Sequence, residues 1–362
     1  MGTNGMSLPS VWLACMALAL GALAGTVSAQ GYYEGETLEI IVPFSPGGGT
    51  DTWARLVAPH LQRQLGEGAS VQVVNVPGAG SVAGANEFAL RREPDGLTAF
   101  VHGGSTVMHY VTREPAVQYE FADFEAIVGS ALGGVVYVRP ELGISTAPEL
   151  LDPPEPLVYG GISATGLDML PLLIFESLDL GIQVIMGYEG RGPARIAFER
   201  GETNIDYSTA SAYLANVVPL VEEGEAVPLF TFGFIDEDGN VARDPVFPDL
   251  PSAREAHVEV HGSEPAGEAW EVYSALLGAM QTEKMLWVHG DAPSEAVDEL
   301  RAASQRMLED PEFIEAARDI VGDYPFVVGD AAAQRFGAVT AISDESVEWV
   351  LDFLREHYDV ER

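Results

Sequence analysis

Basic side chains are scarce in this sequence, and lysine is almost missing from it. The 362 residues include 18 Lys and Arg against 55 Asp and Glu, a formal net charge of −37, and Lys284 is the only lysine. So acidic a surface repels DNA, RNA and anionic membranes, which we exclude as partners. The excess of acid is expected of a chain that works in concentrated salt, where the Debye length falls to about 3 Å and self-repulsion is screened. A surface made acidic only for solubility is the alternative.

Charge is missing altogether from the first 29 residues. Residues 13–24 are almost wholly apolar, and residues 27–29 (VSA) are the small residues that precede a signal peptidase cut. We therefore expect an export signal over residues 1–29, cleavage before Gln30 and a periplasmic mature chain. The apolar stretch is short for a membrane-spanning helix. Because no Lys or Arg precedes that stretch, an uncleaved N-terminal anchor stays open as the alternative.

Cysteine and metal-binding patterns are also nearly absent. Cys15 is the only cysteine, and it lies inside the apolar segment, where a lipid-attachment cysteine is not expected. Its removal with the signal excludes disulfides, thiol nucleophiles and cysteine-based metal sites. Seven histidines form no HExxH motif, and His257 with His261, predicted to share a strand face, have a structural or surface role. Residues 236–240 (DEDGN) lack the later glycine and glutamate of a calcium loop and are interpreted as a polar turn. We expect no metal and no cofactor.

The mature sequence alternates between strand-like and helix-like segments. Short apolar runs bounded by turn residues predict strands, and apolar residues at helical spacing predict helices. The first part follows a β-α-β-α-β order, which implies a parallel sheet, and a second round follows a proline-rich stretch. The predicted strands are 38–44, 71–76, 97–102, 157–160, 182–187, 203–207 and 227–234. The predicted helices are 51–65, 81–91, 165–178, 192–200, 211–224, 293–308, 311–321 and 330–357, with a loop over 235–256.

Two α/β rounds in one chain of this length predict two lobes. We expect residues 30–136 to begin lobe 1, residues 137–253 to form lobe 2, and residues 254–362 to return to lobe 1 and end in helices. Segments 257–261 and 270–277 are expected to be the strands that return to the first sheet. A chain that crosses a hinge twice suits a cleft that closes around a ligand.

The most informative segment is 43–51 (PFSPGGGTD), between the first predicted strand and helix. Its three glycines let the backbone approach a ligand closely, and Thr50 or Asp51 can cap the helix. Free N–H groups in the first turn of a helix attract anions. No Gly-Lys-Ser/Thr follows, so this is not a phosphate-binding P-loop, and a carboxylate is the expected guest rather than a polyphosphate. A tight turn with ordinary capping is the alternative.

Further loops are expected to face the same cleft. Residues 76–81 (VPGAGS) follow the second strand, and ligands bind at the carboxyl edge of an open α/β sheet. Their match to the dinucleotide motif GxGxxA is discounted because an exported protein meets little NAD. Residues 102–106 (HGGST) add donors, and residues 160–166 (GGISATG) are predicted to open a helix in lobe 2, so that a dicarboxylate could bridge both lobes. Tyr188, Arg191 and Asp206 are weaker candidates at the second-lobe edge.

The glycine loops lie within a longer resemblance. The stretches IVPFSPGGGTDTWARLVAPHL, NVPGAGSVAGANEFA and EPDG resemble the solute-binding receptors of tripartite tricarboxylate transporters, the Bug family. LGIQVIMGYEGRGPARIAFERGETNIDY and FPDLPSAREAH resemble later segments of that family, so that the similarity covers roughly residues 37–350. Residues 278–292 (GAMQTEKMLWVHGDA) depart from the family's usual approach to its C-terminal helices.

The resemblance implies an α/β, two-lobed periplasmic binding protein of the type II, Venus-flytrap class with its ligand cleft between the lobes. It also implies a receptor that holds a small organic carboxylate, such as a di- or tricarboxylate, by main-chain amides. The expected partners are that ligand and the integral membrane subunits of a tripartite tricarboxylate transporter, and the chain is expected to be a monomer. The candidate ligand-binding residues are Ser45, Pro46, Gly47, Gly48, Gly49, Thr50, Asp51, Gly78, Ala79, Gly80, Ser81, Ser105, Ser163, Ala164, Thr165, Gly166, Tyr188 and Asp206.

Two other functions remain open at this point. The ligand-binding subunit of a carboxylate-sensing system would use the same cleft but dock onto a signalling membrane protein. An enzyme acting on a small carboxylic acid is the third hypothesis. No GxSxG elbow with His and Asp partners occurs, and Ser45 has no identifiable base, so we expect no catalytic residues.

Overall fold

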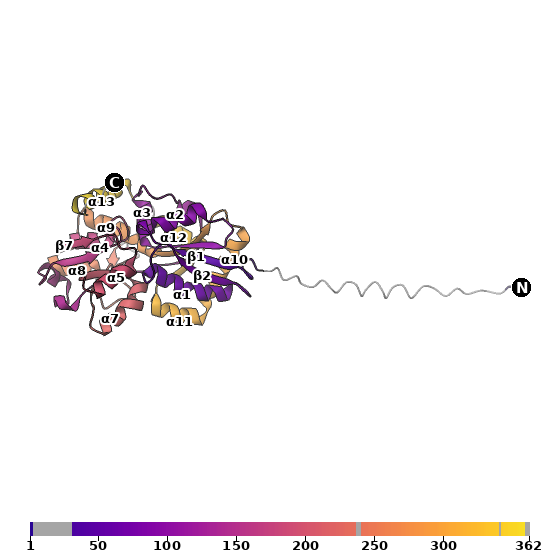
Figure 1. Cartoon of the computed structure of the whole chain (residues 1–362), viewed down its shortest axis with the longest axis horizontal. Coiled ribbons are helices and arrows are strands. Elements are labelled where there is room, and N and C mark those ends of the chain that lie inside the picture. Colours follow the sequence, from indigo (N-terminus) through magenta and orange to yellow (C-terminus); the bar gives the residue numbers. More distant parts are fainter. Residues whose placement is uncertain (3–30, 237–239, 340–341, 359–362) are drawn as a thin grey trace. The chain divides into compact units, whose positions relative to one another are not determined.

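The computed structural model describes residues 1–2, 31–236, 240–339 and 342–358 of the chain. By its contacts the chain divides into residues Met1–Gly31 and a compact unit, Tyr32–Arg362, with which the following account is concerned (Figure 1). The export signal expected over residues 1–29 falls, except for its first two residues, outside the described part. None of the helices that the structure describes has both the length and the apolar character needed to cross a membrane.

The first sheet has six strands in the order β13-β4-β12-β3-β1-β2. β1 pairs in parallel with β2 and β3, whereas β12 runs antiparallel between β3 and β4. Alternate residues of β1 are buried on opposite faces: Ile40 packs in the cluster that includes Trp53, and Ile41 packs in the one that includes Phe88. The strands are β1 (Thr37–Val42), β2 (Ser70–Asn75), β3 (Thr98–His102), β4 (Phe124–Ser130), β12 (Lys284–His289) and β13 (Phe326–Val328).

The second sheet has five strands in the order β7-β6-β8-β5-β9. β6 is parallel to β7 and β8, and β5 is antiparallel to β8 and β9. Its strands are β5 (Gly134–Val138), β6 (Leu157–Gly160), β7 (Ile182–Ile185), β8 (Ile205–Thr209) and β9 (Val227–Thr231), with a separate hairpin of β10 (Phe234–Ile235) and β11 (Val241–Ala242).

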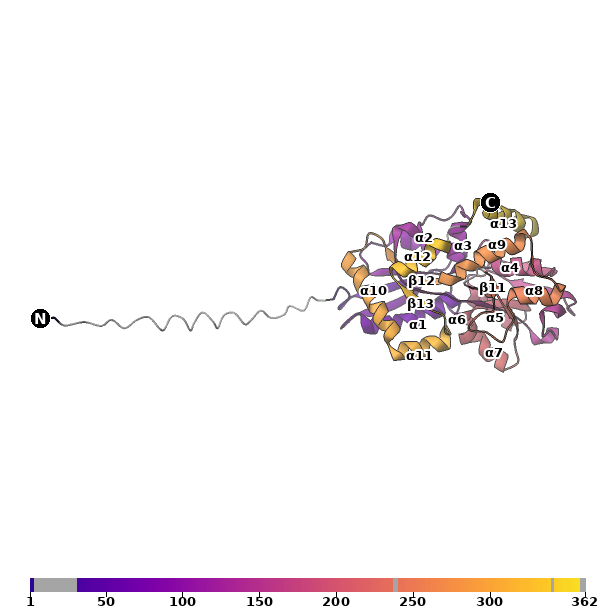
Figure 2. The same cartoon turned by 180° about the vertical axis from the view of Figure 1, so that it is seen from behind.

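Helices cover both sheets (Figures 1 and 2). The first sheet carries α1 (Gly49–Gln64), α2 (Val82–Arg91), α3 (Gly104–Val111), α10 (Ser294–Glu309), α11 (Pro311–Ile320) and α12 (Asp330–Val339). The remaining helices are α4 (Met169–Ser177), α5 (Arg191–Glu199), α6 (Ala210–Ala212), α7 (Val218–Glu222), α8 (Ala253–His261), α9 (Glu268–Leu277) and α13 (Asp344–Tyr358). The two sheets with their helices confirm the predicted α/β, two-lobed fold class. The residue boundaries 30–136, 137–253 and 254–362 of the lobes remain a proposal.

The prediction of strands at 257–261 and 270–277 was wrong, because both segments are helical. Ser252 and Glu255 form a reciprocal capping box that starts α8, with the Glu255 N–H donating to Ser252 Oγ at 3.3 Å and the Ser252 N–H to the Glu255 carboxylate at 2.9 Å. His257 and His261 therefore lie one turn apart on a helix, with ring centroids at 4.5 Å. β12 and β13 make the return to the first sheet instead.

Other differences have local causes. The helix predicted over 211–224 is divided by a π-helical turn, Tyr213–Val217, just before Pro219, whose missing N–H cannot continue the helical ladder. The helix predicted over 330–357 is two helices, α12 and α13. Of the segment interpreted as a polar turn, residues 237–239 lie outside the described part of the chain.

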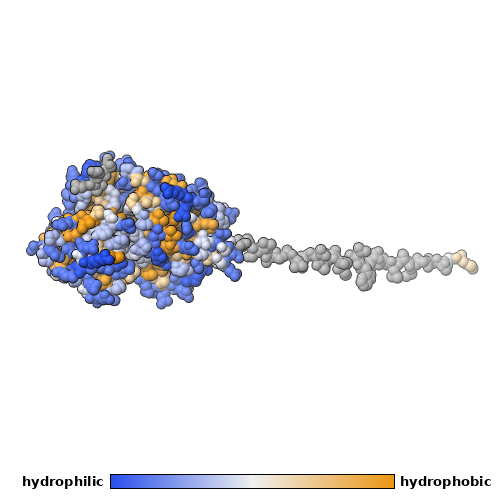
Figure 3. Space-filling view, viewed as in Figure 1, coloured by the Kyte–Doolittle hydropathy of each residue, from blue (hydrophilic) through white to orange (hydrophobic). Residues whose placement is uncertain are grey.

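The surface agrees with an acidic, water-facing protein. The face seen in Figure 3 is mostly hydrophilic, with apolar residues in small separate groups. The large apolar side chains that are exposed, such as Leu90, Leu151 and Ile314, come from separate helices and loops. Single exposed apolar residues of this kind are ordinary on a globular protein.

Candidate ligand-binding site

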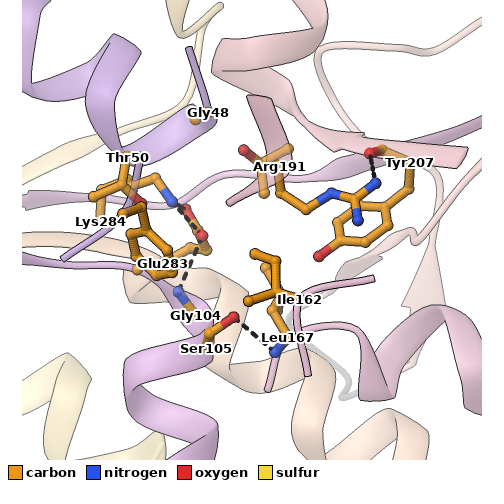
Figure 4. Close-up of a pocket in the computed structure, with 14 residues that line it drawn as sticks. Gly48, Thr50, Gly104, Ser105, Ile162, Leu167, Arg191, Tyr207, Glu283 and Lys284 are labelled. Atoms are coloured by element: carbon orange, nitrogen blue, oxygen red, sulfur yellow. Dashed lines mark hydrogen bonds and ion pairs between the residues drawn. The ribbon is translucent and has the colours of Figure 1, made fainter. Parts of the chain in front are cut away.

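A small pocket, which we call the cavity, lies where the two lobes meet (Figure 4). Lobe 1 contributes the ends of β1 and β3, the first turns of α1 and α3, and the start of β12. The volume of the cavity is about 20 Å³, which is room for about one water molecule. A dicarboxylate does not fit in a space of this size. The lining residues are Phe44, Gly48, Gly49, Thr50, Gly103, Gly104, Ser105, Glu283 and Lys284, with Ile162, Leu167, Arg191, Tyr207 and Thr209 from the segments of the second sheet.

The first glycine loop lies at this cavity, and its helix starts earlier than expected. Gly48, Gly49 and Thr50 line the cavity, whereas the other predicted residues of the loop, Ser45, Pro46, Gly47 and Asp51, are not among the lining residues. α1 begins at Gly49, and Gly48 is its N-cap without a side-chain cap. Gly47 has a φ of 86°, which favours glycine at that position. The carboxylate of Asp51 accepts the Gly47 N–H at 2.9 Å and the Asn75 side-chain amide at 2.9 Å. Asp51 thus shapes the loop, and the N–H groups of the first turn keep no partner within their helix.

The start of α5 faces the start of α1 across the lobes. A Cβ placed on Gly48 would lie 3.6 Å from the backbone nitrogens of both Arg191 and Gly192. A Cβ on Gly192 would lie 2.4 Å from the Pro46 carbonyl oxygen, so the two loops are in direct contact. Each helix start carries a partial positive charge, and an anion held between them would be stabilised by both.

Residues 160–166 were predicted to open the helix expected over 165–178, and that expectation was wrong. α4 begins only at Met169, because the Asp168 carboxylate turns back onto the loop. Asp168 Oδ2 accepts the N–H groups of Ile162 at 3.0 Å and Ser163 at 3.2 Å. The Ser163 N–H, one of the donors expected to meet a guest in this loop, is thus held by a protein carboxylate.

The remaining predicted residues of that loop lie along the seam between the lobes. Ser163 Oγ and Thr165 Oγ1 are 3.0 Å apart, and Ala164 is buried. The Gly166 N–H donates to the Ser163 carbonyl at 2.9 Å. From the opposite side, Ser105 Oγ accepts the N–H of Leu167 at 3.0 Å and lines the cavity.

The second glycine loop does not line the cavity. Gly78, Ala79, Gly80 and Ser81 all have positive φ, at 140°, 47°, 64° and 106°. Such angles are strained for Ala79 and Ser81 and recur at functional loops. A Cβ on Gly80 would lie 2.5 Å from His109 Nε2 and 3.3 Å from Ser163 Cβ, so the loop packs against the seam.

A buried cation in the cavity wall organises the second lobe. Arg191, the first residue of α5, is 7% exposed, and its guanidinium pairs with Asp206 and with Asp168, the latter at 3.2 Å. It also donates to the carbonyls of Gly160 at 2.7 Å and Tyr207 at 2.9 Å. Arg191 therefore fixes the α5 start to β6 and β8, a role that its position in a loop-like stretch did not reveal.

Asp206 and Tyr188 are placed outside the cavity lining. The Asp206 carboxylate is engaged by Arg191 and by the Tyr137 hydroxyl, which donates to it at 3.0 Å. Tyr188 is half-buried, and its ring packs beside Gly160, where a Cβ would lie 3.0 Å from the ring edge. Both residues stand behind or beside the helix start that faces the cleft.

Four lining residues were missed entirely, namely Leu167, Thr209, Glu283 and Lys284. Glu283 and Lys284 precede and begin β12, in the segment that departs from the family pattern. The single lysine of the chain was a usable signal. Its place in the cavity wall depends on β12 inserting between β3 and β4, and a long-range pairing of this kind leaves no local pattern.

His109 joins the two lobes at the seam. It is 2% exposed, with Nε2 3.2 Å from the Gly80 carbonyl oxygen and Nδ1 3.2 Å from Thr165 Oγ1. Burial lowers the pKa of His109 from 6.5 to about 4. Between these two values the unfolded chain binds a proton at this residue and the folded chain does not, so stability is lost as the pH falls through that window.

We therefore expect the replacement His109→Gln to flatten the acid side of the stability profile. Between pH 7 and pH 4 the unfolding free energy of the wild type should fall by up to about 3 kcal/mol more than that of the variant, from a pKa difference worth about 1.4 kcal/mol per unit. Urea unfolding at a series of pH values measures this difference. Parallel profiles for the two proteins would contradict the assignment.

Comparisons with known proteins follow the fold. No family model matches the sequence. The chain is 30% identical over 210 residues to Protein BugT of Bordetella pertussis, an alignment that covers 55% of this chain and 62% of BugT. It is 26% identical over 285 residues to a UPF0065 protein of the same bacterium, covering 77% of this chain and 78% of that protein. The chain thus spans slightly less than two thirds of BugT.

Solved structures share the architecture at low sequence identity. The periplasmic binding protein BugD superposes with a TM-score of 0.65 at 19% identity, over 88% of this chain and 97% of BugD. MatC from Rhodopseudomonas palustris, with bound malate, gives 0.63 at 21% identity, over 87% and 98% of the two chains. A second R. palustris protein, solved with adipate, gives 0.63 at 20% identity, over 87% and 97%. These likenesses establish the periplasmic binding-protein fold.

Proposed function

Because the chain belongs to the Bug family of periplasmic solute-binding proteins, we propose that it captures a small organic carboxylate outside the cytoplasm. In this proposal it delivers the carboxylate to the integral membrane subunits of a tripartite tricarboxylate transporter. The observation that carries the proposal is the meeting of the α1 and α5 starts at the interlobe cavity. We infer that residues 1–29 direct export to the periplasm and that the chain binds its guest without transforming it.

Charge and geometry support a carboxylate guest. The first turns of α1 and α5 lie against each other, with the Arg191 and Gly192 nitrogens 3.6 Å from a Cβ placed on Gly48. Each hydrogen bond from such a donor to a charged group contributes about 1.5–3 kcal/mol. Micromolar affinity needs about 8 kcal/mol, which four to six such donors supply after ordering costs. Malate in MatC and adipate in the second R. palustris protein are both dicarboxylates, a class whose two ends suit two lobes.

Because the cavity is small, the lobes must move before a guest can bind. With room for about one water, the site cannot admit malate without movement. We infer that the lobes open at the seam formed by Ser45 with Glu189 and Ser105 with Leu167, contacts of 3.3 and 3.0 Å. The predicted contacts Ser45 to Asp51 and Ser105 then lie on one wall of the cleft. Gly78 to Ser81, Ser163 to Gly166, Tyr188 and Asp206 stay predictions for a guest larger than the cavity.

A thermal-shift series tests this function directly. The mature protein in high salt, mixed with mono-, di- and tricarboxylates, should be stabilised by its guest by about 2.7 kcal/mol at 100 times the dissociation constant. The matched controls are the diamides of malate and adipate, which keep the length of each acid and remove its charge. No response to any carboxylate, or an equal response to acids and diamides, would reject the proposal.

A further inference from the structure

The single lysine of the chain is buried in the wall of the interlobe cavity. Lys284 is 2% exposed and Glu283 is 1% exposed, and the two side chains form an ion pair. Figure 4 shows the pair beside Gly104 and Thr50, on the lobe 1 side of the cavity. All the other residues counted as Lys or Arg are arginines. The planar fork of arginine suits bidentate contacts, whereas lysine offers a compact point charge.

The Glu283 carboxylate is held by two groups that would bind any carboxylate, an amide N–H and an ammonium. Its Oε1 accepts the N–H of Gly104 at 3.1 Å, at the start of the eight-residue helix α3, and the carboxylate also contacts the Lys284 ammonium. Gly104 lies at the junction of the lobes, since a Cβ there would lie 2.6 Å from a methyl carbon of Leu167. A helix-start amide and a buried ammonium thus converge on one carboxylate at the closing surface.

Stability alone does not account for this pair. A buried ion pair returns little net free energy, because the desolvation of two charges offsets their attraction. Burial raises the pKa of Glu283 and lowers that of Lys284, so that both charged forms are disfavoured. The Glu283 carboxylate can therefore be displaced by another carboxylate that binds Lys284 more favourably.

Unpaired donors face the same cavity from the second lobe. Among the described residues, the Tyr207 hydroxyl and Thr209 Oγ1 are buried and have no hydrogen-bond partner. Both residues line the cavity, and Figure 4 shows the Tyr207 hydroxyl directed towards Ile162. Buried polar atoms normally find a partner, so these two hydroxyls lie ready for a guest atom.

We propose that Lys284 Nζ and the Gly104 N–H form a carboxylate subsite that Glu283 fills in the closed protein and that a guest carboxylate takes over. The inference rests on the proposed function, since it names the side chains that recognise one end of the guest. Tyr207 and Thr209 add hydroxyl donors for the other end of the guest, beside the α1 and α5 starts that line the same cavity. Glu283 is thus an internal competitor that weakens binding of every carboxylate guest.

Chemical rescue tests the subsite without knowledge of the natural guest. Glu283→Ala leaves a carboxylate-sized space beside Lys284 and Gly104, and acetate should refill it. In a constant high-salt background, acetate should raise the melting temperature of Glu283→Ala by several degrees more than chloride at equal ionic strength. The acetate effect should be smaller in the wild type, where Glu283 competes, and should vanish relative to chloride in the double variant Glu283→Ala/Lys284→Met. An acetate response of Glu283→Ala no larger than that to chloride overturns the proposal.

A second variant keeps the test decisive if Glu283→Ala does not fold. Glu283→Gln preserves the side-chain volume, and in protein labelled with ¹³C-lysine the one lysine signal should move on addition of acetate. The affinity of Glu283→Gln for malate should be about tenfold higher than that of the wild type. The affinity of Lys284→Met for malate should be lower than that of the wild type by about tenfold or more, as expected for one charge-assisted contact. A stationary signal and affinities within twofold of the wild type refute the subsite. Acetate rescue in a protein that binds no larger acid upholds the subsite and refutes the proposed function.

Discussion

Replacing Gly48 with valine should abolish carboxylate capture while leaving the unfolding free energy almost unchanged. Gly48 has φ −86° and ψ 170°, an extended conformation that a β-branched residue adopts without strain. The first added carbon fits, because it would lie 3.6 Å from the nearest atoms. The γ-methyl groups of valine would project onto Arg191 and Gly192, so that the α1 and α5 starts could no longer close on an anion.

The expected loss is large because two sets of donors are separated at once. Losing two hydrogen bonds to a charged group costs about 3–6 kcal/mol, which lowers affinity by a factor of roughly a hundred or more. Calorimetric titration with the acid found by thermal shift measures the loss. Gly48→Ala adds only the tolerated carbon and should retain binding within about tenfold. Gly181→Val is the matched control, since a Cβ at Gly181 meets no atom within 4 Å. Unchanged affinity in Gly48→Val would place the guest elsewhere.

The second large effect is expected from Arg191→Met. This change should lower the unfolding free energy by about 3–5 kcal/mol, the usual cost of removing one partner from a buried ion pair. The reason is that Asp168 and Asp206, both nearly fully buried, would lose the cation between them. The carbonyls of Gly160 and Tyr207 would lose donors as well.

Denaturant unfolding of wild type and variant measures this loss. Arg254→Met is a suitable control, because Arg254 and its partner Glu264 are both largely exposed and such pairs contribute less than about 1 kcal/mol. Adding Asp206→Asn to Arg191→Met should recover part of the stability, since one stranded charge is removed. A loss no greater than that of the control would show that Arg191 is not the anchor of the α5 start.

The parts of the site that the sequence predicted are those encoded locally. The loop ending in Gly49 was recognised because strand, glycines and helix follow one another within a few residues. The helix opening after Gly160 was wrongly predicted because Asp168 occupies the donors of that loop, and a local glycine pattern does not show where a later carboxylate turns. The α5 start was given little weight because the partners of Arg191 are 15 and 23 residues away.

The fold shows the same division between local and distant information. Parallel pairing of β1 with β2 and β3 follows from the order of strands and helices in the sequence. The insertion of β12 between β3 and β4 does not follow from that order, because all the strands of the second sheet lie between β4 and β12 in the sequence. The Glu283 and Lys284 wall of the cavity comes with β12, and it was missed for that reason.

A chain with one lysine also carries its own reporter. Apart from the amino terminus, an amine-directed dye finds a single target, and Lys284 is shielded while the lobes are shut. The rate at which the dye attaches would then depend on how often the lobes open, without an engineered cysteine or a second label. Because this side-chain amine is buried, its labelling would report the opening of the unmodified protein.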